Sequence, residues 1–298
     1  MYNNHSMQTK LGEVKTNRKT VMQMADYNID ELHRRTLQVL LAVDRVCREH
    51  DITYYISDGT MLGAVRHGGF IPWDDDADIC MPRPDYERFI AHGSEWLPQP
   101  LEMACFERDE HCSNAFMKII DGSTTLIERW SFNQIGGVYI DVFPMDGVST
   151  TKWLRKLNFA RYKMVDRWRY MRNRDPYKRG RGYTSWIPRL LQATVKNITI
   201  LRLLKRIQTA RSYENTQLVA DFDSGERSVM PRQVLGKPKP VMFEGHELMG
   251  VEHPDDYLKR LFGDYMQLPP EEKRRIHGFD YVDLDHSYHD YKDTRHFK

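Results

Sequence analysis

The stretch SDGTMLGAVRHGGFIPWDDDADICMPR, residues 57–83, places four aspartates within the five positions 74–78. Like charges at this spacing disfavour one another's ionised forms, so the run needs a compensating positive charge or full exposure to water. Residues 51–59 before it and 76–81 within it have the composition of strands, and residues 60–67 can begin a helix. The acidic run is therefore expected at the start of a strand in a mixed α/β segment.

Side-chain alternation along that strand places Asp76 and Asp78 on one face and their apolar neighbours on the other. In GVYIDVFPMDG (137–147) the same alternation separates Asp141 from buried valine and isoleucine side chains. If the two strands are neighbours, the three carboxylates form the oxygen-rich site that Mg²⁺ or Mn²⁺ prefers, and such a site suits phosphoryl transfer. We predict Asp76, Asp78 and Asp141 as catalytic and metal-binding residues. The alternative is an acidic turn that is simply solvated.

A second set of residues is predicted to bind substrate. Gly59 and Thr60 end a strand and open a helix, where backbone N–H groups and the helix dipole favour a phosphate. Arg66 and His67, at the far end of that helix, and Lys118, in FMKIID, are candidate phosphate contacts. Each has an ordinary structural alternative: a common strand-to-helix turn, a surface arginine, a turn-capping histidine and a structural lysine.

Bulk properties narrow the class of protein. The 298 residues suffice for one large domain or two small ones, and no apolar run is long enough to cross a bilayer. The first residues are polar and lack the apolar core of a secretory signal. The four cysteines form no C-x-x-C pair, so free thiols in a reducing cytoplasm are expected.

Charge is distributed unevenly along the chain. Residues 152–211 contain 18 Lys/Arg and two acids, which leaves 26 basic and 40 acidic residues elsewhere from totals of 44 and 42. Three interpretations of this basic block stay open: a solvated helical face, a site for an anionic acceptor glycan, or peripheral contact with the anionic inner face of the cytoplasmic membrane. No RNA-binding module is apparent, so no nucleic-acid partner is expected.

The order of predicted elements suggests how the chain is organised. A mixed α/β front is followed by a helical, basic segment and then by short strands and turns. The expected parts are a flexible N-terminal segment (1–26), a catalytic core (27–150), a basic helical insertion (151–215), a C-terminal segment completing the catalytic domain (216–280) and a polar tail (281–298).

Three blocks resemble the signature of the LicD family, whose relatives include fukutin and fukutin-related protein. They are YYISDGTMLGAVRHGGFIPWDDDADICMPRPDYERF (54–89), GGVYIDVFPMDGV (136–148) and MFEGHELMGVEHPDDYLKRLFGDYMQLPPEEKRRIH (242–277). Gly59-Thr60 matches the Gly-Ser/Thr step of the nucleotidyltransferase superfamily, Asp76 and Asp78 its D-x-D pair, and Asp141 its third acid. The interval between step and pair is longer than in the simplest members and contains RHGGFIPWDD (66–75).

The resemblance implies an α+β fold: a DNA polymerase β-like nucleotidyltransferase core with a mixed sheet and a helical insertion. It also implies Mg²⁺- or Mn²⁺-dependent transfer of phosphorylcholine from CDP-choline, releasing CMP, to a hydroxyl of a bacterial cell-surface glycan such as lipopolysaccharide or teichoic acid. The acceptor can be a free or a lipid-linked glycan. Alternatives are transfer of another CDP-linked phospho-alcohol, such as ribitol or glycerol phosphate, and nucleotidyl transfer to another substrate.

Overall fold

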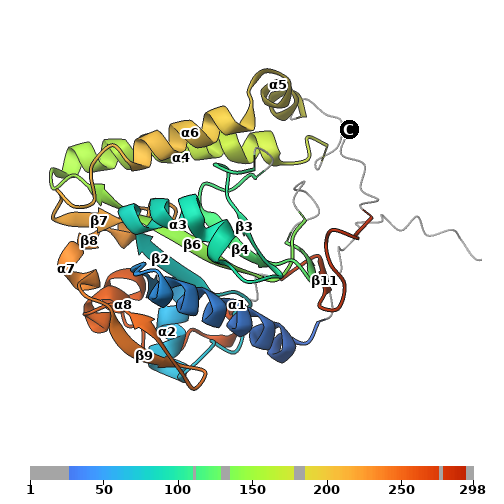
Figure 1. Ribbon diagram of the computed structural model, residues 1–298. Helices are drawn as coiled ribbons and strands as arrows, with labels where there is room; N and C mark the ends of the chain where they lie inside the picture. The colour runs from blue at the N-terminus through green and yellow to red at the C-terminus, as the bar shows by residue number, and fades with distance from the viewer. Residues whose placement is uncertain (1–26, 110–111, 129–134, 178–184, 275–277, 293–298) are drawn as a thin grey trace, which may run out of the picture.

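The computed structural model describes residues 27–109, 112–128, 135–177, 185–274 and 278–292 (Figure 1). Its α-helices are α1 (Ile29–Glu49), α2 (Asp58–His67), α3 (Arg83–Trp96), α4 (Lys152–Asn173), α5 (Trp186–Thr194), α6 (Asn197–Gln208), α7 (Arg232–Leu235) and α8 (Pro254–Phe262). Its strands are β1 (Tyr55–Ile56), β2 (Asp78–Pro82), β3 (Leu101–Ala104), β4 (Met117–Asp121), β5 (Thr125–Ile127), β6 (Tyr139–Val148), β7 (Leu218–Ala220), β8 (Met230–Pro231), β9 (Lys239–Phe243), β10 (His246–Gly250) and β11 (Tyr281–Asp283). The predicted flexible segment 1–26 lies outside the described residues.

The centre of the molecule is a seven-stranded mixed sheet. Its main path runs β1-β2-β6-β4-β3, and β7 pairs with both β6 and β8. Strands β2 and β6 are parallel, with Asp78 opposite Asp141, whereas β1–β2, β4–β6 and β6–β7 are antiparallel. The predicted mixed α/β architecture is confirmed, and the two strands expected to be neighbours are adjacent.

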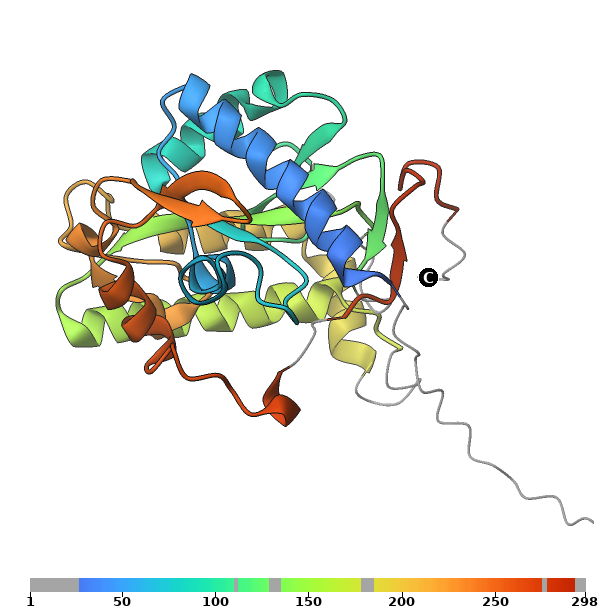
Figure 2. The ribbon, with the colours of Figure 1, turned by 90° about the horizontal axis from the view of Figure 1, so that it is seen from below.

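Helix α1 forms over a segment whose apolar residues recur at helical spacing. Asn28 caps its N-terminus, because its side-chain oxygen accepts hydrogen bonds from the backbone N–H groups of Asp30 and Glu31. Leu32, Val39 and other residues at helical spacing are buried on one side of the helix. The helix lies against β4 and β6, on the opposite side of the central strands from α4 (Figure 2).

Strand β6 pairs with three other strands and also forms an ion pair with helix α3. Its first half pairs with β2 and β4, and its last three residues pair with β7. Near its end the buried carboxylate of Asp146 accepts two hydrogen bonds, at 2.8 and 2.6 Å, from the guanidinium of Arg83 at the start of α3. This bidentate ion pair fixes α3 to the central strand.

Helices α4, α5 and α6 follow β6 directly and form a separate layer. Figure 1 shows α4 and α6 side by side along one edge of the molecule, with α5 at one end. Phe159, Tyr162 and Val165 of α4 pack against α6 residues such as Leu201 and Leu204 in a second apolar core. The chain re-enters the sheet at β7, so the helical segment separates two strands that pair with each other.

Two expectations about the rest of the chain can be compared with the structure. All four cysteines are free, as predicted, and all four are buried. Within the segment 281–298, strand β11 pairs with β5, and His289 lies 2.7 Å from a carboxylate oxygen of Glu102. Among the described helices, none combines the length and the hydropathy needed to cross a bilayer.

Candidate functional site

Three aspartates meet at one end of the sheet: Asp78 and Asp141 lie on strands β2 and β6, and Asp76 lies in the bend just before β2, where a strand from residue 76 had been predicted. Carboxylate oxygens of Asp76, Asp78 and Asp141 all lie within 4.8 Å of one another. Asp78 begins β2 and is the register partner of Asp141 on the parallel strand β6, so backbone pairing alone brings these two together. The backbone N–H of Asp141 also donates to the carbonyl of Ala77, between the two acids of the D-x-D pair. The structure therefore places the three predicted acids in one cluster.

The predicted alternation around Asp141 is confirmed, since Val138, Ile140 and Val142 are 0–1% exposed and Asp141 lies on the other face. That other face is also covered: Tyr139 and Asp141 are 9% and 8% exposed. Both faces are covered because helices and the C-terminal part of the chain pack on the sheet. The Asp141 carboxylate consequently lies in a largely water-excluded site.

The Gly-Thr step contacts this cluster through hydrogen bonding and close packing. The Thr60 hydroxyl accepts a 2.7 Å hydrogen bond from the backbone N–H of Asp78, which fixes the start of β2 to α2. A Cβ at Gly59 would lie 2.5 Å from Oδ2 of Asp74, so this carboxylate would have to move to admit a side chain there. These contacts place the N-terminus of α2 beside the acids.

Lys118 lies within the cluster, in an ion-paired position. Its Nζ is 3.0 Å from Oδ1 of Asp141 and 2.6 Å from Oε1 of Glu128, and it sits 3.3 Å from the centre of the Tyr139 ring. Burial lowers the pKa of Lys118, but the carboxylates of Asp141 and Glu128 outweigh it and raise this pKa above the usual range. Lys118 is thus a charged partner of Asp141.

Arg66 and His67 lie at the other end of α2. With a rise of about 1.5 Å per residue, they are roughly 10 Å along the helix axis from Gly59. Arg66 donates a 2.9 Å hydrogen bond to the carbonyl of Tyr265 and a 3.0 Å bond to the ring of His67. The structure does not bring this pair into the acidic cluster.

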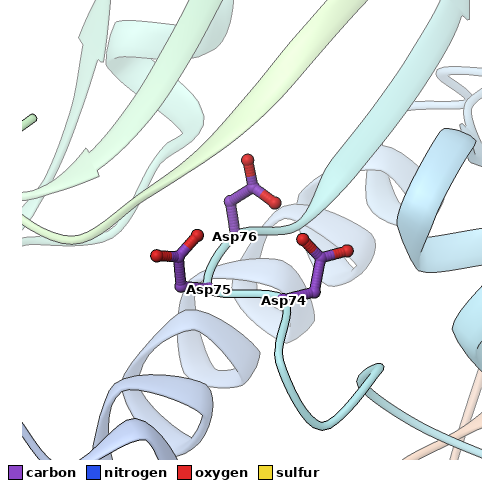
Figure 3. A group of neighbouring side chains, drawn as sticks. All are labelled: Asp74, Asp75 and Asp76. Carbon is purple, nitrogen blue, oxygen red and sulfur yellow. The ribbon is translucent and has the colours of Figure 1, made fainter. Parts of the chain in front are cut away.

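The other two aspartates of the acidic run differ from Asp76. Figure 3 shows the three consecutive carboxylates spread around the bend before β2, with Asp76 directed toward the sheet. Asp75 is 2% exposed and accepts hydrogen bonds from the Tyr27 hydroxyl and the Gly278 backbone N–H, both at 2.9 Å. Asp75 therefore joins the two ends of the described chain to the site. Oxygens of Asp74, Asp75 and Asp76 also lie within 4.8 Å of one another.

Burial and mutual repulsion dominate the electrostatics of the cluster. Burial raises the pKa of Asp78 well above its usual range, and Asp76, Asp58 and Asp141 raise it further. Burial also raises the pKa of Asp141 to about 7, although Lys118 opposes this shift. A divalent cation among the three acids would reverse both effects, because it favours the ionised carboxylates.

Sequence reasoning missed three further acids near the cluster. Asp58, at the start of α2, is close enough to contribute to the raised pKa of Asp78. Asp221 and Asp223 follow β7, and burial together with Asp223 and Asp58 raises the pKa of Asp221 to about 8. The sequence LVADFDSG (218–225) could have indicated Asp221 and Asp223, because a second acid pair there follows a strand.

A pocket opens beside Lys118. Its volume is about 210 Å³, and the aromatic side chains lining it include Phe116, Tyr139 and Tyr170. Glu128 and Asp223 supply carboxylates to the wall, and Arg169 and Lys118 supply cations; Gly136, Gly137, Ser113, Asn114, Ile120 and Leu126 complete the lining. The pocket thus lies between the acidic cluster and helix α4.

The donor set of the cluster fits a hard divalent cation. Three carboxylates offer oxygen ligands close enough to share an ion, and Asp141 Oδ1 is buried from water. Excess negative charge in a water-excluded site is what such an ion would neutralise. Asp76, Asp78 and Asp141 could hold Mg²⁺ or Mn²⁺, and the geometry does not distinguish the two.

We expect the metal-free protein to lose stability as pH rises toward about 8. Asp141, with its pKa raised to about 7, binds its proton more tightly when folded than when unfolded, so its contribution is present at low pH and is lost on ionisation. Thermal melts in EDTA should show this loss. Added Mg²⁺ should raise the melting temperature more at about pH 8 than at about pH 6, because fewer protons then compete for the carboxylates.

Asp141→Asn provides the control for that experiment. The variant should flatten the pH dependence in EDTA and reduce the stabilisation by Mg²⁺, since one ionisable ligand is gone. Full Mg²⁺ stabilisation of Asp141→Asn would place the cation elsewhere.

Residues 51–172 match the family model described as LicD/FKTN/FKRP, nucleotidyltransferase domain. This matched segment contains all three acids of the cluster. The chain is 25% identical over 252 residues to the lipopolysaccharide cholinephosphotransferase LicD of Haemophilus influenzae, a match spanning 81% of this chain and 92% of the relative. Uncharacterized proteins of Rickettsia typhi and Rickettsia prowazekii are 38% and 40% identical over 78 and 62 residues, 26% and 21% of this chain and 24% and 22% of those proteins. The predicted family resemblance is confirmed.

Proposed function

We propose that this chain, whose residues 51–172 match the LicD-family model, is a cation-dependent phosphotransferase with a nucleotidyltransferase-type fold. It moves a phospho-alcohol group, phosphorylcholine from CDP-choline in the first instance, to a hydroxyl of a bacterial cell-surface glycan and releases CMP. The observation that carries the proposal is the convergence of Asp76, Asp78 and Asp141 within the family-matched segment. The relative in Haemophilus influenzae, named for cholinephosphate transfer to lipopolysaccharide, supports the substrate class.

The chemistry is an in-line displacement at phosphorus. The acceptor oxygen forms a bond to the phosphorus that carries the alcohol, the bond from that phosphorus to the bridging oxygen breaks, and CMP leaves with that oxygen. A divalent cation held by Asp76, Asp78 and Asp141 supplies positive charge that neutralises the donor pyrophosphate. The Asp141 carboxylate accepts the proton that the acceptor hydroxyl loses.

Other residues position these groups. Lys118 holds Asp141 through their 3.0 Å contact, and Thr60 fixes the start of β2 through the backbone of Asp78. The backbone N–H groups of Gly59 and Thr60, in the first turn of α2, favour binding of a donor phosphate. Arg66 and His67, at the far end of α2, remain predicted substrate contacts.

The pocket beside Lys118 favours choline as the transferred alcohol. A quaternary ammonium is attracted to aromatic faces and to carboxylates, and this pocket offers Phe116, Tyr170 and Asp223. Lys118, paired with Glu128, and Arg169 oppose a cation in the same wall. Ribitol and glycerol carry hydroxyl groups and no charge, so they gain less from such a lining. We place the reaction in the cytoplasm, and the four free buried cysteines agree with a reducing compartment.

A donor screen tests the proposal directly. The purified chain is incubated with Mg²⁺, an acceptor glycan extract and CDP-choline, CDP-ribitol, CDP-glycerol, ATP or CTP in turn, and CMP and pyrophosphate are quantified. We expect CMP release with CDP-choline to exceed that with the other CDP-alcohols by about tenfold or more, as loss of a charged contact implies. CMP release should stop in EDTA. Pyrophosphate release from ATP or CTP would instead support nucleotidyl transfer.

A further inference from the structure

Helix α4 has two apolar faces, and the fold uses only one of them. Phe159, Tyr162 and Val165 are 2% exposed and pack in the second apolar core. On the other side, Trp153, Leu157, Met164 and Trp168 are 65%, 50%, 52% and 41% exposed. With about 100° of rotation per residue these four residues form one stripe, centred nearly opposite the buried face.

Positive charge borders this exposed stripe. On the helical wheel Lys156, Lys163 and Arg167 lie along one side of it and Arg161 along the other. All four side chains are exposed, and none makes an ion pair with any residue within the described ranges. We call this stripe, together with its four cations, the α4 surface.

The neighbouring helix extends the same character. Trp186, Ile187 and Leu190 of α5, which packs beside α4, are 57%, 38% and 52% exposed. Of the 14 large apolar side chains that are exposed in the described part of the chain, nine belong to α4, α5 and α6. Exposed apolar side chains gather in this layer, which is also the basic part of the sequence.

We propose that the α4 surface binds the surface of an anionic lipid bilayer, with the tryptophans in the headgroup region and the lysines and arginines on anionic headgroups. An apolar stripe bordered by cations suits an interface that is apolar beneath and negative above, and tryptophan favours that depth. Charge complementarity selects this occupant over a second copy of the chain, because two α4 surfaces facing each other would oppose like charges.

Helix α4 contributes residues to both the α4 surface and the pocket beside Lys118. Arg169 and Tyr170, immediately after Trp168, line the pocket beside Lys118. On the helical wheel both residues lie on the side of α4 turned away from the stripe, so a helix lying on the bilayer would hold the pocket one helix diameter, roughly 10 Å, above the lipid headgroups. An acceptor glycan still attached to a lipid could reach the pocket without leaving the membrane.

Vesicle flotation tests the proposal without any measurement of activity, so its outcome is independent of the proposed reaction. The full chain is mixed with phosphatidylcholine vesicles that contain either no phosphatidylglycerol or about 30% of it. We expect flotation only with the anionic vesicles, weakened several-fold by 0.5 M salt, as surface-charge attraction requires. Brominated lipid should quench tryptophan fluorescence, which reports insertion of the rings.

Two matched pairs of variants separate insertion from simple charge attraction. Trp153→Ser combined with Trp168→Ser should lower the partition coefficient about tenfold, whereas Met242→Ser combined with Met266→Ser, equally exposed elsewhere, should not. Lys156→Gln with Lys163→Gln should give a similar loss, and Lys237→Gln with Lys259→Gln should not. Circular dichroism checks that each variant is folded.

Three outcomes would overturn the proposal. The first is wild-type binding that the tryptophan pair does not affect, which would mean adsorption by charge alone. The second is a stable dimer in sedimentation that the tryptophan pair dissociates, which would assign the surface to a second chain. The third is failure to float with anionic vesicles while a soluble anionic glycan binds, which would assign it to the acceptor.

Discussion

Replacing Asp78 with alanine is expected to reduce CMP release by about a thousandfold or more, with the fold intact. The residue begins β2 opposite Asp141, and its oxygens lie within 4.8 Å of those of the two other acids. In the proposed mechanism, removing it takes away a cation ligand at the point where charge develops during phosphoryl transfer. The measurement is CMP release under saturating CDP-choline and Mg²⁺.

The melting temperature of the metal-free Asp78 variants provides a second test of this prediction. Burial and the neighbouring acids raise the pKa of Asp78, so in metal-free protein its carboxylate is a source of repulsion. Asp78→Asn should therefore melt in EDTA at or above the wild-type temperature while losing turnover. The exposed Asp256→Asn on α8 is the matched control and should retain both activity and melting temperature. Substantial Mg²⁺-dependent turnover by folded Asp78→Ala would remove this residue from the mechanism.

The largest expected effect on stability comes from Arg83. Arg83→Met should destabilise the protein by about 3–5 kcal/mol, because it leaves the carboxylate of Asp146 buried without its partner. Asp146 is 0% exposed, and burial already raises its pKa although Arg83 opposes the shift. Urea or thermal unfolding measures the loss, which should shrink at low pH, where Asp146 takes up a proton.

A double variant distinguishes loss of a charge partner from loss of packing. Arg83→Met combined with Asp146→Leu removes both charges and should recover most of the stability, since apolar side chains can replace a buried ion pair. Lys259→Met breaks an exposed pair with Asp255 and should leave the unfolding midpoint unchanged. If the double variant is no more stable than Arg83→Met alone, the cost lies in packing and the ion pair is not its cause.

The face of each strand on which the acids lie was predictable because alternation is a local property, whereas the adjacency of β2 and β6 had to be assumed. Alternation along two strands separated Asp76, Asp78 and Asp141 from apolar neighbours, and the structure places them together. Helix α1 was also predictable, since its apolar spacing and its Asn28 cap can both be recognised within one continuous stretch of sequence.

The unpredicted residues depend on pairing between distant segments. Asp58 and Asp221 influence each other's environment only because β7 returns to β6 after the helical layer. Asp75 accepts hydrogen bonds from Tyr27 and Gly278, which are far apart from each other in sequence, and no local pattern indicates these contacts. Lys118 was predicted to meet phosphate, and only the β4–β6 register, Lys118 opposite Asp141, reveals its ion pair.

The register of β6 with β7 has one further consequence. Val148 and Leu218 are direct partners in an antiparallel ladder, so the whole of α4, α5 and α6 departs from and returns to a single spot on the sheet. The parts of this segment beyond α4 can be lengthened or trimmed without shifting the strands that carry Asp78 and Asp141. Helix α4 is the exception, because its Arg169 and Tyr170 line the pocket beside Lys118.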